Sequence, residues 1–260
     1  MLYLFSFLPV YVVSAAIFLL ILLFNWLGYK FKNWLIEKHP GRVPENIGAV
    51  EGSLLGILGL LLAFTFSVAM SKYEARRQIT VDEANKIGTA ILRCDMYPDS
   101  IRNPLRANFK EYVEARIAYY AAGDDEEKIQ NELKRANEIS GSIWKTAALQ
   151  SRNRENFIVS NQMIPILNAM IDIVTTRDAS RISSVPTLIL WVLLSLVVMS
   201  AFVLGSDYNG KKRNKILILS YAIAMSLTLN LINELNRPRS GLITLDAVEQ
   251  KMIELRELVK

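Results

Sequence analysis

The segment that decides the fold reads LLAFTFSVAMSKYEARR and runs from Leu61 to Arg77. Its first ten residues are apolar or small, and the block that follows carries Lys72, Arg76 and Arg77 against a single acid, Glu74. Neither Pro nor Gly interrupts this change of character. The pattern is typical of one helix that leaves an apolar medium and continues into water. It therefore predicts a membrane helix that extends well beyond the bilayer.

Four windows of the chain are apolar enough to cross a membrane. Of the 260 residues, 52% are hydrophobic, and most of the excess over an ordinary soluble domain lies in these windows. About 20 apolar residues are needed to cross a hydrocarbon core of ~30 Å. The windows are 5–27, 48–70, 185–204 and 216–232, and the last reaches the required length when extended to 214–234. The sequence predicts four transmembrane helices.

The windows divide the chain into four regions. Residues 1–70 hold the first two spans and a basic connecting loop, whereas residues 71–184 form a polar insert. Residues 185–236 hold the third and fourth spans with a short basic loop, and residues 237–260 form a C-terminal tail. The insert lacks the long alternation of apolar and polar residues that marks a strand. We therefore expect an all-α polytopic membrane protein with four transmembrane helices and a long helical insert between the second and third spans.

The first window is interpreted as a membrane span and not as a secretion signal. No basic segment precedes it. Its apolar run is also longer than the ~7–15 residues of a typical signal. We expect it to remain part of the protein.

Two apolar stripes predict amphipathic helices inside the insert, because their members recur at steps of three and four residues. The first stripe comprises Ile101, Leu105, Phe109, Tyr112, Val113 and Tyr120, and the second comprises Ile129, Leu133, Ala136, Ile143 and Ala147. Between them, Gly123 is a predicted helix stop, followed by a capping box of Asp124 with Glu127. Pro165 is expected to kink a later helix over residues 156–176.

A stripe of small residues runs along the second predicted span. This small-residue stripe comprises Gly48, Gly52, Gly56, Gly59, Ala63 and Ser67. Small side chains at such spacing let helix backbones approach closely in lipid. Two interpretations remain open: the stripe packs on another span of the same subunit, or it helps to form the central wall of an oligomer.

The other face of this span is a candidate pore lining. It carries Leu54, Leu58, Leu61, Leu62 and Thr65, to which Phe64 is added as a candidate. An apolar constriction of this kind can gate a pore by dewetting. The only acid in the window, Glu51, is either an interfacial side chain or an intramembrane ionisable group that marks a site.

The basic collar, which we define as Lys72, Arg76 and Arg77, follows the second span directly. Such residues commonly anchor a helix by reaching the lipid headgroups. Repeated around a symmetric oligomer, they would instead form a positive ring at a pore mouth and favour anions.

Motifs of enzyme chemistry are missing from the sequence. Its single histidine, His39, lies in a predicted loop, and its single cysteine, Cys94, follows a helical face and cannot form an internal disulfide. The sequence contains no phosphate-binding glycine loop, zinc-ligand spacing or serine elbow. We expect no enzyme activity, cofactor or metal site. The net charge of +5 comes from basic residues beside the spans, so no nucleic-acid partner is expected.

Four segments carry a resemblance to a known family. They read LLAFTFSVA, YEARRQITVDEANKIGTAILR, LNAMIDIVTTR and LNRPRSGLI. The chain resembles the bestrophin-like family of bacterial membrane proteins, which is distantly similar to the bestrophin anion channels. The resemblance implies four spans per subunit and a homo-oligomer, such as a pentamer, around an anion pore lined by the second span. It also implies a bacterial inner-membrane protein whose insert and C-terminus are cytoplasmic.

The chain departs from the animal bestrophins at their acidic calcium clasp. The corresponding stretch NELNRPRSG offers only Glu234. Calcium gating is therefore not expected. The density of basic residues in the two short loops favours the opposite orientation of the insert, so sidedness stays open at this point.

Two functions follow from these patterns. In the first, an oligomer embedded in the lipid bilayer passes small anions through a pore formed by the second span, with Arg76 and Arg77 at its mouth. In the second, a non-conducting scaffold or sensor anchors the insert, whose apolar stripes bind a partner.

Overall fold

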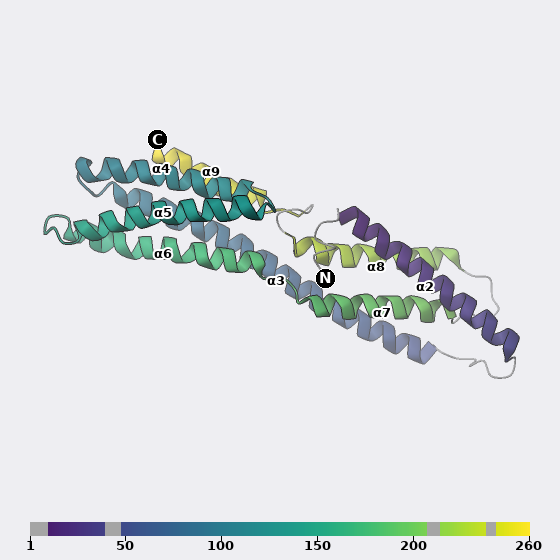
Figure 1. The fold of residues 1–260 in the computed structure, drawn as a ribbon. Coiled ribbons are helices and arrows are strands. Elements are labelled where there is room, and N and C mark those ends of the chain that lie inside the picture. Colours follow the sequence, from purple (N-terminus) through teal and green to yellow (C-terminus); the bar gives the residue numbers. More distant parts are fainter. Residues whose placement is uncertain (1–9, 40–47, 207–213, 238–242) are drawn as a thin grey trace. The chain divides into compact units, whose positions relative to one another are not determined.

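The computed structural model describes residues 10–39, 48–206, 214–237 and 243–260. Its helices are α2 (Val10–Lys38), α3 (Gly48–Cys94), α4 (Asp99–Ala121), α5 (Glu126–Gln150), α6 (Phe157–Ile182), α7 (Thr187–Ser206), α8 (Lys215–Leu235) and α9 (Asp246–Glu254), followed by the 3₁₀ helix η1 (Leu255–Val259) (Figure 1). The described residues contain no strand. Four helical segments are long and apolar enough to cross a membrane. The predicted all-α polytopic class is confirmed.

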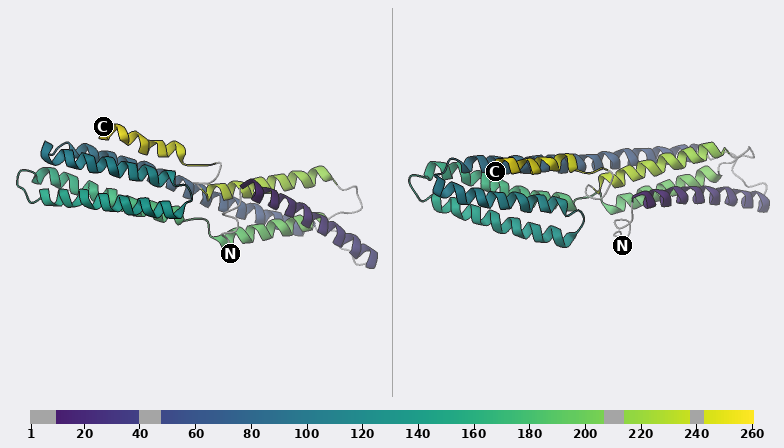
Figure 2. Two further views of the ribbon diagram at one scale, coloured as in Figure 1. Left: turned by 45° about the horizontal axis from the view of Figure 1, so that its top comes forward. Right: turned by 90° about the horizontal axis from the view of Figure 1, so that it is seen from above.

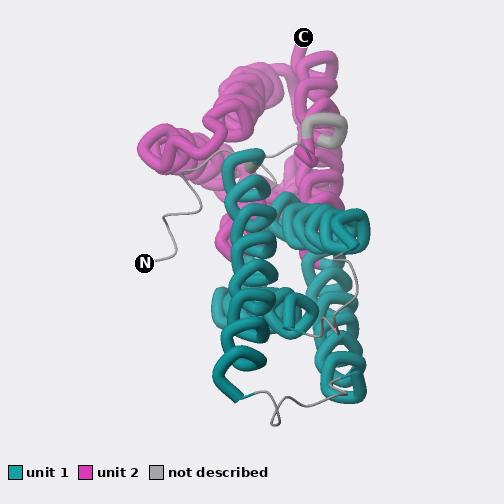
Figure 3. The backbone as a smooth tube through the Cα atoms, turned by 90° about the vertical axis from the view of Figure 1, so that its right-hand side faces the viewer, with its two compact units in different colours: residues 1–71, 184–236 teal, residues 72–183, 237–260 magenta. Residues whose placement is uncertain are grey.

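The chain forms two compact units, shown in different colours in Figure 3. Unit 1 comprises residues 1–71 and 184–236, and unit 2 comprises residues 72–183 and 237–260. Helix α3 contributes to both, because it continues without a break through residue 71. At ~1.5 Å per residue, its 47 residues extend over roughly 70 Å.

Unit 1 is organised by a close contact between α2 and α7, and α2 also packs on α8. A Cβ atom added to Gly28 would lie 2.0 Å from the carbonyl oxygen of Phe202, and one added to Gly205 would lie 2.0 Å from that of Asn25. The Asn25 side-chain amide donates a hydrogen bond to the carbonyl of Ala201 over 3.1 Å. Glycine and one buried amide therefore allow the two backbones to approach closely, as is common between helices in lipid.

Unit 2 has a hydrophobic core formed by α3, α4, α5, α6 and the C-terminal helices. Figure 1 and Figure 2 show α4, α5, α6 and α9 beside the later part of α3. Every member of the two predicted apolar stripes is buried in this core except Ile101, which is partly buried against it. The stripes therefore hold the unit together. They are not the exposed surface on which the scaffold interpretation depends.

Local features of the insert differ in detail from the predictions. Gly123 does end a helix, with a positive φ of 56°. The following cap is Asp125, whose side chain accepts from the amide of Lys128, so the predicted cap at Asp124 was wrong by one residue. Pro165 lies within α6, which is continuous from Phe157 to Ile182. The helix instead ends before Pro186, whose ring and missing amide hydrogen favour a helix start there.

We expect Gly205→Ala to destabilise the protein, because its Cβ would clash with backbone atoms that cannot move independently. Overpacking of this kind lowers the free energy of unfolding by about 1–3 kcal/mol. The matched control is Gly141→Ala in α5, where an added Cβ meets nothing within 4 Å. There alanine should raise the free energy of unfolding by about 0.5–1 kcal/mol. Thermal unfolding in detergent measures both, and equal midpoints would contradict the tight α2–α7 contact.

Candidate functional site

One face of α3 is buried within unit 1. Leu58, Leu62, Thr65 and Ala69 recur at steps of three and four residues and are at most 7% exposed. The Thr65 hydroxyl donates to the carbonyl of Leu61 over 2.7 Å, so it is satisfied within its own helix. The candidate pore-lining residues therefore differ in their exposure within the single chain. Leu58, Leu62 and Thr65 are buried, Leu54 and Leu61 are half-buried, and Phe64 is 62% exposed.

The small-residue stripe lies on another face of α3, and all of its members are exposed in the single chain. A Cβ atom added to Gly52, Gly56 or Gly59 would meet no atom within 4 Å. Among the described residues, these glycines do not pack on another helix, unlike Gly28 and Gly205. Glu51, at the start of this helix, is half-buried.

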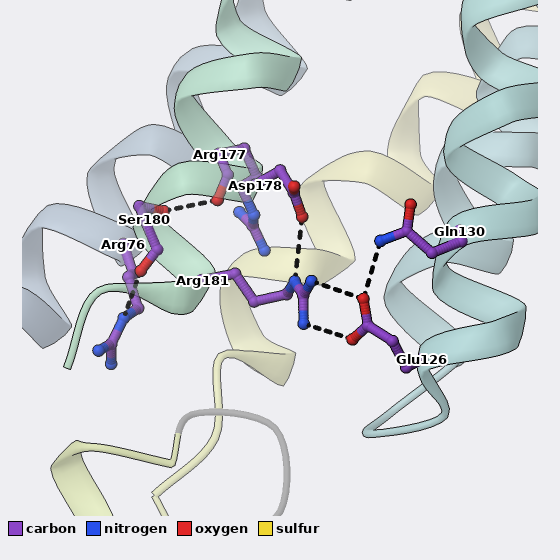
Figure 4. Close-up of polar contacts among 7 residues, drawn as sticks. All are labelled: Arg76, Glu126, Gln130, Arg177, Asp178, Ser180 and Arg181. Atoms are coloured by element: carbon purple, nitrogen blue, oxygen red, sulfur yellow. Dashed lines mark hydrogen bonds and ion pairs between the residues drawn. The ribbon is translucent and has the colours of Figure 1, made fainter.

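Arg76 of the basic collar is buried and binds the end of α6. Its Nε donates to the carbonyl of Ser180 over 3.2 Å (Figure 4). Its Nη2 donates to the carbonyl of Ser183 over 2.7 Å. The last carbonyls of a helix have no partner within it, and a cationic side chain is well suited to satisfy them. Lys72 donates to the Ser183 hydroxyl over 2.6 Å. Arg76 and Lys72 therefore attach α3 to the C-terminus of α6.

Arg77, the third member of the collar, points elsewhere. Its side chain is 52% exposed and pairs with Glu74, one helical turn earlier, over 3.2 Å. An exposed pair of this type contributes little to stability. The charge of Arg77 therefore remains available to solvent and to mobile ions.

Two arginines of α6, Arg177 and Arg181, lie near Arg76 of α3 (Figure 4). Arg181 donates to both carboxylate oxygens of Glu126 over 2.9 and 3.1 Å, and to Asp178 over 3.1 Å (Figure 4). Arg177 lies with its Cζ 4.4 Å from the centre of the Tyr120 ring. The C-terminal end of α6 is thus a dense set of arginines that are held by hydrogen bonds, carboxylates and an aromatic face.

The sequence patterns missed a buried ion pair in unit 2. Arg116 of α4 and Glu83 of α3 have fully buried side chains, with Arg116 Nε 2.5 Å from Glu83 Oε1. The Tyr120 hydroxyl donates to the second carboxylate oxygen over 2.7 Å. Burial alone would lower the pKa of Arg116, but the neighbouring Glu83 carboxylate raises it. The sequence does contain a signal for this pair, because Arg116 lies within an apolar stripe, four residues after Tyr112 and four before Tyr120.

The two side chains considered for catalysis have ordinary surroundings. Cys94 is buried, and its Sγ lies 3.6 Å from the carbonyl of Arg102. Burial raises the pKa of this thiol to about 11, which disfavours the nucleophilic thiolate at neutral pH. His39 is exposed. Within the described ranges, no three side chains of His, Cys, Asp or Glu are grouped as a metal site.

We expect Arg76→Gln to lower the free energy of unfolding by about 2–3 kcal/mol, because it removes charged donors from buried carbonyls at the end of α6. The matched control is Arg77→Gln, which removes an exposed partner and should change stability by less than about 1 kcal/mol. Thermal unfolding of the detergent-solubilised protein distinguishes them. Similar midpoints for the two variants would mean that Arg76 does not anchor α6.

Known proteins share this architecture. The Bestrophin-like domain matches residues 11–248. The fold is similar to a bacterial bestrophin homologue from Klebsiella pneumoniae, with a TM-score of 0.68, 13% identity, and coverage of 94% of this chain and 98% of that one. A variant of a membrane protein matches with a TM-score of 0.71 and 12% identity over 93% of this chain and 98% of that one. No curated protein matches in sequence. The chain belongs to the bestrophin-like family.

Proposed function

We propose that the protein is a homo-oligomeric membrane channel for small anions, with α3 forming the wall of the pore. The observation that carries this proposal is the exposed small-residue stripe of α3, which leads towards the exposed charge of Arg77. Membership of the bestrophin-like family and the four apolar helices support it.

The faces of α3 suggest how subunits would meet. An apolar face exposed to lipid needs no further contact, but glycines contribute little contact area of their own and favour the close approach of another helix. At about 100° per residue, Phe64 lies roughly 100° around the helix from the stripe. The small-residue stripe would then contact a neighbouring α3, while Phe64 supplies an apolar constriction. Leu58, Leu62 and Thr65 would support the helix from inside the subunit.

We place the protein in a bacterial inner membrane with unit 2 and the C-terminus in the cytoplasm. The family resemblance supports this orientation. The basic residues on the two sides are nearly balanced in number, so charge does not oppose it strongly. The collar would then lie at the cytoplasmic end of the pore.

We expect native mass spectrometry in mild detergent to find a ring of about five subunits. Gly56→Leu should reduce the fraction of complete rings, because a large side chain there blocks the approach of a neighbour. It should leave the folded subunit intact, since its Cβ meets no atom of its own chain within 4 Å. A monomer or simple dimer for the unmodified protein would refute the α3-lined pore.

We expect Arg77→Glu to reduce anion-over-cation permeability several-fold, because a ring of acids replaces a ring of bases at the pore mouth. The control is Arg135→Glu, which also has about half its side chain exposed and also pairs with an acid three residues earlier. Flux from liposomes and reversal potentials in bilayers measure the selectivity. Unchanged selectivity in a conducting Arg77→Glu protein would remove Arg77 from the pore mouth.

A further inference from the structure

The core of unit 2 contains hydrogen-bond donors that the described protein atoms do not satisfy. Arg116 is completely buried, and Tyr112, one turn earlier on α4, is 1% exposed. Among the described residues, the two terminal nitrogens of Arg116 and the hydroxyl of Tyr112 have no hydrogen-bond partner. Buried polar groups without partners are strongly unfavourable, and charged ones most of all. These atoms therefore indicate a ligand that accepts hydrogen bonds.

The nearby carboxylate is already occupied. Glu83 accepts from Arg116 Nε at one oxygen and from the Tyr120 hydroxyl at the other. It therefore fixes the orientation of the guanidinium through one edge of the group. The guanidinium also lies against the Tyr119 ring, with its Cζ 4.3 Å from the ring centre, but among the described residues its terminal nitrogens have no hydrogen-bond acceptor.

Two guanidiniums lie close to one another in this core. Arg177, whose side chain is 5% exposed, lies against the same Tyr120 ring as Arg116, with Cζ atoms 4.4 and 5.8 Å from the ring centre. Its Nη2 forms an ion pair with Glu249 Oε1 over 3.7 Å, and the Glu249 side chain is 19% exposed. Each guanidinium thus has one carboxylate partner, Glu83 for Arg116 and Glu249 for Arg177. Of the two acids only Glu83 is completely buried, whereas Glu249 is partly in contact with water, which screens its charge.

We propose that the terminal nitrogens of Arg116 and the hydroxyl of Tyr112 bind a small monovalent inorganic anion of the size of chloride in the core of unit 2. A guanidinium only donates hydrogen bonds, and an anion only accepts them. A water molecule at the same place would also need acceptors for its own two hydrogens. Burial raises the pKa of Tyr112, which keeps its hydroxyl a donor at neutral pH.

This site differs in place and role from the proposed pore. Its residues belong to unit 2, and its ligand would be a structural part of the folded bundle. Binding to the native state alone makes stability depend on the concentration of the ligand. The anion can therefore be detected whether or not the protein conducts ions.

The test is the thermal midpoint of the full-length protein in mild detergent, with sodium chloride replacing sodium gluconate at constant ionic strength. Gluconate is too large for a site formed by three buried donor atoms. We expect a saturable rise of roughly 3–5 °C at ten times the Kd for chloride. Tyr112→Phe removes one donor and should weaken the apparent affinity about tenfold or more. The control is Tyr97→Phe, which removes a buried hydroxyl that bonds Ser160 and should keep the full response.

Arg116→Lys provides a second test, since it keeps the charge but loses the terminal guanidinium nitrogens, and should abolish the response. If that variant does not fold, Tyr112→Phe decides alone. Bromide bound in crystals should also give an anomalous peak within hydrogen-bond distance of the Arg116 terminal nitrogens and the Tyr112 hydroxyl. A flat midpoint in chloride, or a response that Tyr112→Phe and Tyr97→Phe retain equally, would overturn the proposal.

Discussion

The hydrocarbon interior of a membrane gives a peptide group no partner outside its own helix, and this constraint governs the whole chain. Two hydroxyl side chains in the spans follow the same rule. Thr65 and Ser195 each donate to the carbonyl four residues earlier, so neither has an unsatisfied hydrogen in an apolar setting. Between the spans, a few hydrogen bonds such as that from Asn25 to the Ala201 carbonyl accompany contacts that depend on shape. The glycines that meet the opposite backbone at α2 and α7 supply that shape.

Outside the spans, the same chain uses charge in a different way. The arginines of unit 2 each have a distinct environment: Arg76 binds carbonyls, Arg181 binds carboxylates, and Arg116 is enclosed with Glu83. A buried ion pair adds little net stability compared with apolar side chains of the same volume, but removal of one partner is costly. The pair links α3 to α4 at one position along their lengths.

Much of the fold, but little of the candidate site, was predictable from the sequence. Apolar runs of sufficient length identify spans, and three- and four-residue periods identified the core of unit 2. The faces of α3 could not be assigned, because lipid and protein interior accept the same side chains. Leu58 is 1% exposed and Leu60 is 58% exposed, yet both are leucines. Arg76 and Arg77 are likewise adjacent and identical, and only the position of the α6 C-terminus distinguishes them.

The unbroken hydrogen bonding of α3 has a mechanical consequence. The chain passes between the units through α3, through residues 183–184 and through residues 236–237. Only the first passage is a continuous helix, because α6 ends at Ile182 before Pro186, and α8 ends at Leu235. A helix resists bending and twisting, whereas a non-helical joint accommodates both. Of the three connections, α3 is therefore the one that resists bending and twisting, and the small-residue stripe and Arg77 belong to this same helix.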